Sequence, residues 1–134
     1  MQHQRVEPPA RLRGLDAARR FFAGSFSDPD RAREELLVAH LDGDTRCVHL
    51  ARYDGGEAMV AMPVKAILAD ALAHGSHGVV LAHNHPGGDP VPSKDDCRAT
   101  RLLVTAAQAI DVTVVDHLVF AGRECSSFRR MGLL

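Results

Sequence analysis

Apolar positions recur every three to four residues in some stretches of this chain and run alternately or continuously in others, which predicts helices interspersed with strands. Near the N-terminus, helical spacing predicts an amphipathic helix over residues 10–23. Its expected apolar face comprises Leu12, Leu15, Ala18 and Phe22. A short second helix is expected to start at Asp28-Pro29, because aspartate is a good N-cap and proline suits the first helical position.

The next segment has the pattern of a β-hairpin. Strands are predicted over residues 36–41 and 47–53, joined by the turn residues Asp42-Gly43-Asp44. Two glycines then turn the chain again, and residues 58–62 are expected to form a third strand.

The second half of the sequence predicts a helix, a buried strand, another helix and a group of late strands. Pro63 opens the first helix, and Gly75 is expected to end it. The run over residues 78–82 is apolar throughout, as in a central strand buried on both faces. A long helix is expected over residues 93–110, and the late strands over residues 112–115, 118–120 and 125–128. The predicted fold class is α/β in the broad sense, an α+β domain with one mixed β-sheet flanked by helices.

Composition narrows the class of protein. The chain has 134 residues, of which 46% are hydrophobic and 25% charged, as expected for one globular domain with a real core. No apolar run is long enough to span a membrane, and the N-terminus lacks the apolar segment of a secretion signal, which favours a cytoplasmic protein. Cys47, Cys97 and Cys125 form no Cys-x-x-Cys pair and are expected to be reduced thiols. A net charge of −1 gives only weak support for DNA as a partner.

The string HNHPGGDPVPSKDD carries the candidate chemistry. His83 and His85 end the apolar strand and fall on one of its faces, while Asn84 points to the other and is expected to be a structural hydrogen-bonding residue. Asp96 follows at the expected first turn of a helix. Two neutral imidazoles and one carboxylate make a ligand set for a catalytic zinc ion with one position left for water, which predicts hydrolysis by a metal-activated water.

Ser93 and Asp96 also have a purely structural interpretation. Ser-x-x-Asp at a helix start is close to a capping box, in which the serine caps the helix and the acidic side chain reaches back. The histidines upstream favour the metal interpretation, since two of them closing a strand ahead of a spaced aspartate are hard to explain by packing. Asp95 is then an alternative capping partner or a solvated charge.

The spacing His-x-His-x7-Ser-x-x-Asp resembles the JAMM signature of the JAB/MPN metalloprotease superfamily. The longer string LAHNHPGGDPVPS resembles the RadC branch of bacterial JAB domains, with Gly87 where that branch usually has serine. Looser matches occur at Arg33-Glu34 and at Asp116-His117-Leu118, so the likeness covers about residues 30 to 128. It implies the JAB/MPN fold, similar in layout to cytidine deaminases, with an N-terminal arm and helix over residues 1–29 and the metalloprotease domain over residues 30–134.

The resemblance also implies roles for residues. His83, His85 and Asp96 would bind Zn²⁺, and Ser93 would help to stabilise the oxyanion of the tetrahedral intermediate. The activity implied is that of a zinc-dependent peptidase or isopeptidase acting on a protein or peptide.

The family carries a catalytic glutamate just before its first strand, and counting back from Asp42 places Glu34 there. A one-residue slip would select Glu35 instead, whose side chain would face the other side of the strand. Both glutamates also fit an interpretation as solvated charges beside Arg31 and Arg33.

Other functions fit less well. A non-catalytic MPN scaffold would keep the fold without its metal ligands, which are intact here. An HNH-type nuclease draws its site residues from separated positions, and a zinc deaminase needs His-x-Glu and Pro-Cys-x-x-Cys, neither of which occurs. A role in DNA repair, the label of RadC proteins, is weakened because only about thirty residues precede the JAB-like part, with no room for a DNA-binding helix-hairpin-helix pair.

The remaining histidines offer weaker signals. His117 is interpreted as a partner of a metal ligand, a DNA contact or a structural histidine. No spacing that suggests a site is found for His40, His49, His74 and His77.

Overall fold

The computed structural model describes residues 10–27, 32–54 and 62–134, and in these ranges the chain forms three α-helices and five β-strands. The elements, in chain order, are α1 (Leu15–Ala23), β1 (Glu35–Leu41), β2 (Cys47–Asp54), α2 (Val64–Ala73), β3 (Gly78–Asn84), α3 (Lys94–Gln108), β4 (Thr113–Ala121) and β5 (Glu124–Ser127).

The strands form one mixed sheet in the order β2-β1-β3-β4-β5. β1 runs antiparallel to both β2 and β3, β3 runs parallel to β4, and β4 is antiparallel to β5. The parallel pair needs a long crossover, which α3 supplies. β3 is the middle strand and all seven of its residues are buried, which explains its continuous apolar sequence.

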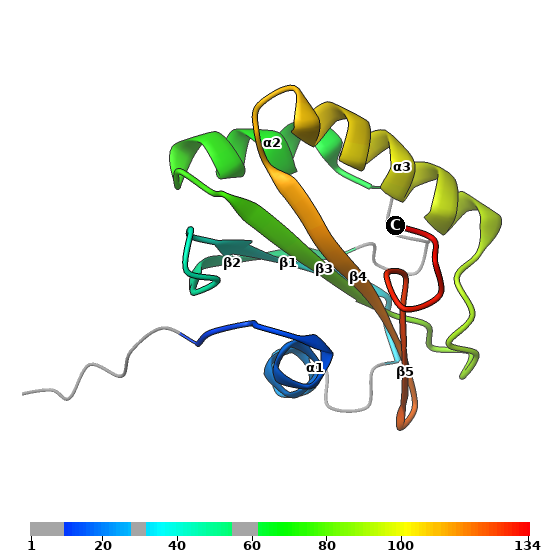
Figure 1. Ribbon diagram of the computed structural model, residues 1–134. Helices are drawn as coiled ribbons and strands as arrows, with labels where there is room; N and C mark the ends of the chain where they lie inside the picture. Colours follow the sequence, from blue (N-terminus) through cyan, green and yellow to red (C-terminus); the bar gives the residue numbers. More distant parts are fainter. Residues whose placement is uncertain (1–9, 28–31, 55–61) are drawn as a thin grey trace, which may run out of the picture.

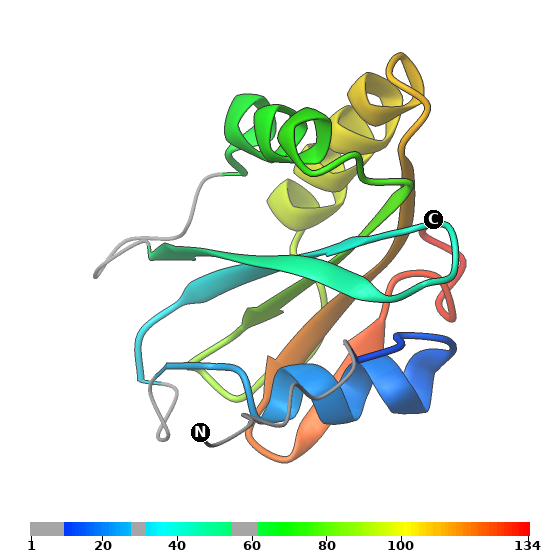
Figure 2. The same cartoon turned by 90° about the vertical axis from the view of Figure 1, so that its left-hand side faces the viewer.

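Helices cover both faces of the sheet (Figure 1). α2 and α3 lie on one face and α1 on the other, a separation that is also clear in the view turned by 90° (Figure 2). Alternation along β3 sends Val79 and Leu81 into the core beneath α2 and α3, and Val80 and Ala82 into the core above α1. The predicted α+β fold class, with a mixed sheet between helices, is therefore confirmed.

One predicted helix and two predicted strands differ from the observed elements. The first helix begins at Leu15 and not at residue 10, because the segment before it pairs with the sheet: Leu12 N donates to Thr45 O at 2.9 Å and Cys47 N donates to Ala10 O at 2.8 Å. The first two late strands form one continuous strand, β4. The start of the short helix at Asp28-Pro29 and most of the strand expected over residues 58–62 lie outside the described residues.

Candidate metal centre

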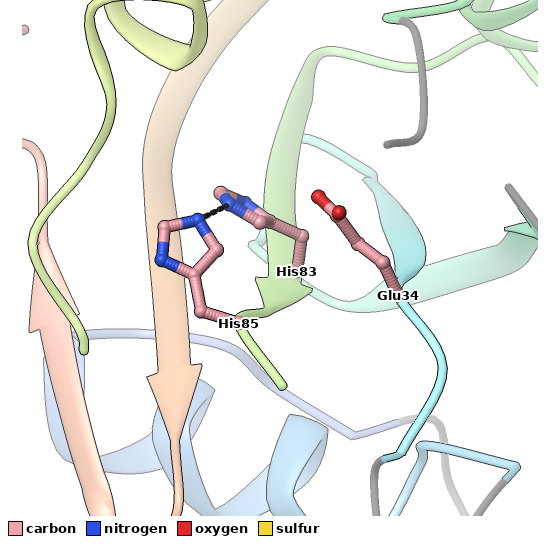
Figure 3. Close-up of side chains that lie close together, drawn as sticks. All are labelled: Glu34, His83 and His85. Atoms are coloured by element: carbon pink, nitrogen blue, oxygen red, sulfur yellow. Dashed lines mark hydrogen bonds between the residues drawn. The ribbon is translucent and has the colours of Figure 1, made fainter. Parts of the chain in front are cut away.

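The end of β3 places His83 and His85 on the sheet face that α2 and α3 cover. His83 follows Val79 and Leu81 at alternate positions and is buried, whereas His85 lies one residue beyond the strand and is partly exposed. The His85 backbone N–H still donates to Phe120 O at 2.8 Å, which continues the pairing with β4. The two imidazoles therefore lie side by side, with their Nε2 atoms 2.8 Å apart (Figure 3).

A chain of buried hydrogen bonds fixes the tautomer of His83. The Thr100 hydroxyl donates its one proton to the backbone carbonyl of Asp96 at 2.7 Å. It must therefore accept from His117 Nδ1, which lies 2.8 Å away. His117 Nε2 then carries no proton and accepts from His83 Nδ1 at 2.6 Å. As a result, His83 Nε2 is left as a free lone pair.

His117 is suited to this role because it stays neutral. Its side chain is buried and stacks on Phe128, with the ring centres 4.4 Å apart. Burial, followed by the neighbouring charge of His83, lowers the pKa of His117 well below its ordinary value of 6.5. Of the three interpretations of His117, the structure shows the contact with His83 and buries the side chain away from any nucleic acid.

His85 presents its Nε2 in the same way. Its Nδ1 lies 2.8 Å from the backbone carbonyl of Asp89. A carbonyl only accepts, so Nδ1 carries the proton and Nε2 is bare. Asp89 belongs to the Pro/Gly loop, which therefore orients His85 as well as joining β3 to α3.

Asp96 brings its carboxylate to the two bare nitrogens. Its Oδ2 lies 3.1 Å from His85 Nε2 and 3.4 Å from His83 Nε2. Burial opposes its ionisation. When a proton occupies His83 Nε2, hydrogen bonding and charge from that ring, together with hydrogen bonds from Ser93, hold the pKa of the Asp96 carboxyl well below its usual range. We call these three residues the β3 cluster.

The β3 cluster fits a zinc ion. Three electron-rich atoms at 2.8 to 3.4 Å repel one another unless a proton or a cation lies among them. The ligand atoms of a tetrahedral zinc site lie roughly 3.3 Å apart, given Zn–N and Zn–O bonds of about 2.0 to 2.2 Å. The spacing of the β3 cluster is close to that value before any ion is bound.

The two candidate glutamates point to different places. The carboxylate of Glu34 lies beside His83 and His85, where the possible ligand atoms of the three residues are all within 4.8 Å of one another (Figure 3). Glu35, the next residue, instead accepts hydrogen bonds from Ser27 and pairs with Arg52 at 3.3 Å. Burial raises the pKa of Glu34 above its ordinary value of 4.5, although His83 and His85 pull it down.

Asn84 holds the backbone on both sides of Glu34. Its Oδ1 accepts from Glu35 N at 2.7 Å, and its Nδ2 donates to Arg33 O at 2.7 Å. The expected structural role of Asn84 is therefore confirmed. Asn84, which lies between the two histidines, thus fixes the backbone that carries Glu34.

Ser93 is the N-cap of α3, and the capping box is complete. Its Oγ accepts from Asp96 N at 2.9 Å, and its backbone N–H donates to Asp96 Oδ2 at 2.9 Å. The hydroxyl proton takes no part in either bond, so capping and donation to a bound substrate are compatible. The expected capping box is therefore present in the structure. Its presence does not exclude a role for Ser93 as a donor to the oxyanion.

Two groups at this site carried no signal in the sequence. Thr100 lies inside a helix, and the Asp89 carbonyl belongs to the backbone of a loop. Neither residue type at those positions indicates a ligand-orienting role, which depends on tertiary contact alone.

Comparison with known proteins defines the class of this domain. The family model of the RadC-like JAB domain matches residues 12–133, and the chain belongs to that family. The match includes α1 as well as the sheet. The boundary expected at residue 30 stays a prediction.

Similar curated proteins carry names without a stated function. A "UPF0758 protein" from Pelodictyon phaeoclathratiforme is 34% identical over 79% of this chain and 48% of its own length. The "UPF0758 protein YfjY" of Escherichia coli K12 is 36% identical over 76% of this chain and 64% of its own length, and "UPF0758 protein YkfG" of the same strain is 36% identical over 76% and 65%. The chain thus spans about half to two thirds of the length of these relatives.

None of the helices among the described residues has the length and apolar character needed to cross a membrane. Cys47, Cys97 and Cys125 are half-buried and form no disulfide bond within the described residues.

Proposed function

We propose that this protein is a zinc-dependent metallopeptidase or isopeptidase of the JAMM type. The observation that carries the proposal is that His83 and His85 each use Nδ1 in a hydrogen bond elsewhere and present Nε2 to the Asp96 carboxylate. A proton-accepting group, Glu34, stands beside them. Membership of a JAB family makes a metal-dependent hydrolase the first candidate for such a site.

The residues divide the work of amide hydrolysis. A zinc ion bound by the β3 cluster would polarise the substrate carbonyl and lower the pKa of a water molecule. Glu34, whose pKa is raised by burial, takes a proton from the attacking water and returns it to the leaving amine. The Ser93 hydroxyl donates its uncommitted proton to the oxyanion of the substrate.

The partly exposed side of the β3 cluster suits a polypeptide substrate. His85 and Asp96 have side chains that are 20% and 11% exposed, so an extended chain can reach the ligands while His83 stays buried at 4%. The net charge of −1 offers little attraction for nucleic acid, which favours a protein or peptide substrate over DNA.

The proposal is tested with two measurements on purified protein. Elemental analysis should find zinc, one equivalent of which is lost in His83→Ala. Mass spectrometry should detect new amino termini when the protein is incubated with a peptide library and with a matching library of lysine-linked isopeptides. Glu34→Gln serves as the zinc-loaded inactive control. A zinc-loaded wild type that cleaves neither library better than Glu34→Gln would favour the alternative, a non-catalytic MPN scaffold or a DNA-repair-associated protein.

A further inference from the structure

A second group of histidine and carboxylate side chains lies on the same sheet face, toward the other end of β1. Leu36 of β1 pairs with His83, whereas His40 pairs with Val79 of β3 and with His49 of β2. Near this end, His49 meets two residues of the α2 region, Asp70 and His74, whose possible ligand atoms all lie within 4.8 Å of one another and of His49. We call His49, Asp70 and His74 the α2 cluster.

Hydrogen bonds leave ligand atoms free in the α2 cluster. His74 Nδ1 lies 2.9 Å from the backbone carbonyl of Asp70, so this nitrogen carries the proton and Nε2 is bare. The Asp70 Oδ2 accepts from the Tyr53 hydroxyl at 3.0 Å, which orients the carboxylate. Burial, and then the contact with Asp70, raises the pKa of Tyr53 to about 12, so Tyr53 remains a donor.

Three imidazole rings are packed closely together in this region. The rings of His49 and His74 stack with centres 3.9 Å apart and planes 8° apart. His40 borders both, with its ring centre 5.6 Å from that of His49 and 6.1 Å from that of His74.

His40 is fully buried and incompletely bonded. Its Nδ1 lies 2.9 Å from Ser76 Oγ, while its Nε2 has no hydrogen-bond partner within the part of the chain that the structure describes. Burial, then the neighbouring His49, lowers the pKa of His40 to about 4. The ring is therefore neutral near pH 7 and adds no positive charge that would oppose a cation.

We propose that His49, Asp70 and His74 form a second zinc site, separate from the β3 cluster. Two imidazole nitrogens and one carboxylate oxygen favour borderline ions such as Zn²⁺ and Co²⁺ over Mg²⁺ and Ca²⁺. The possible ligand atoms lie within 4.8 Å of one another, and rotation of the His49 and His74 side chains can adjust them to the roughly 3.3 Å spacing of a tetrahedral zinc site. Both have side chains with access to solvent, so rotation displaces no core residue.

The second site joins two parts of the domain that are distant in sequence. β2 is an edge strand of the sheet, and His74 directly follows the last residue of α2. An ion held by both would fix the end of the helix to the edge strand. The role of this ion is structural. The proposal of a second site does not depend on the activity proposed for the β3 cluster.

The test is a zinc titration of the chelator-stripped full chain, with free zinc buffered in the micromolar range and bound zinc measured by elemental analysis. We expect two equivalents in the wild type and one in His74→Ala. His77→Ala is the matched control, because it removes another exposed histidine from the next turn of chain, and it should keep two equivalents.

A variant that lacks the β3 cluster tests the second zinc site separately from the proposed function. The double variant His83→Ala/His85→Ala should bind one equivalent, and adding His74→Ala should abolish binding. Zinc, but not Mg²⁺, should raise the melting temperature of the double variant, and His74→Ala should remove that shift.

Two outcomes would overturn the second site. If the wild type binds one equivalent of zinc and the double variant binds none, the zinc is bound by the β3 cluster. The α2 cluster is then not a zinc site. If His74→Ala still binds a second equivalent of zinc, that zinc is bound adventitiously at the surface. In this case too, the α2 cluster is not a zinc site.

Discussion

The β3 cluster and the α2 cluster offer the same donors, two imidazoles and one carboxylate, near opposite ends of one sheet face. In the β3 cluster the donor atoms are 2.8 to 3.4 Å apart, and a buried chain through His117 and Thr100 fixes the buried imidazole. In the α2 cluster the side chains are half-buried or exposed, and the supports are one backbone carbonyl and the hydroxyl of Tyr53. Organisation before binding, and not donor type, distinguishes the two.

That difference bears on affinity and on chemistry. Ligands that are already held together lose less conformational entropy when an ion binds, so the β3 cluster should bind zinc more tightly. Glu34 gives the β3 cluster an adjacent proton acceptor. The α2 cluster contacts a third histidine, His40, and the hydroxyl of Tyr53, which suits a structural ion.

The largest expected effect comes from His83→Ala. It should remove the zinc of the β3 cluster and all hydrolysis, while zinc bound by the α2 cluster remains, because the two sites share no residue. Elemental analysis and peptide cleavage measure both effects. Stoichiometric zinc at this site in both His83→Ala and His85→Ala would contradict the ligand assignment.

Glu34→Gln should leave zinc bound and abolish cleavage, because it removes the proton acceptor without removing a ligand. Glu35→Gln is the matched control, since the Glu35 side chain bonds to Ser27 and Arg52 instead. Single-turnover cleavage with parallel zinc analysis distinguishes the two variants. An inactive Glu35→Gln with an active Glu34→Gln would reverse the assignment.

Ser93→Asp separates capping from catalysis. Aspartate caps a helix as well as serine does, so the melting temperature and zinc content should change little. An ionised carboxylate donates no proton and places negative charge where the oxyanion forms, so turnover should fall roughly a hundredfold or more. Equal turnover in wild type and variant would leave Ser93 as a cap only.

The smallest expected effects come from residues that hydrogen-bond to the candidate ligands of the two clusters and orient them. His117→Gln should weaken zinc binding by the β3 cluster about 10- to 100-fold, the usual cost of losing a group that orients a ligand. Tyr53→Phe, which removes the hydroxyl bond to Asp70, should weaken the α2 cluster less, because that carboxylate is partly exposed. Competition with a zinc indicator measures both, and a larger loss for Tyr53→Phe would invert the comparison.

The same comparison shows what a single sequence reveals. The β3 cluster is encoded locally, since His85 and Asp96 are 11 residues apart and one strand-loop-helix unit carries the whole set. The mixed sheet and its central strand could also be predicted, because the apolar run of β3 is continuous. The α2 cluster and the Thr100–His117–His83 chain depend on tertiary packing, so no spacing in the sequence indicates them. The early start expected for α1 failed because backbone pairing with residues 45 and 47 competes with helix formation.

The clamp that Asn84 forms around Glu34 has a consequence for the order of events during folding. The ligands of the β3 cluster close a short loop, whereas the Asn84 contact with Glu35 spans 49 residues and the His83 contact with His117 spans 34. Short loops close at a lower entropic cost than long ones, so local contacts tend to form first. A newly synthesised chain would then acquire its metal ligands before its proton acceptor is in place. Under the proposed function, such an intermediate holds zinc but is not yet a protease.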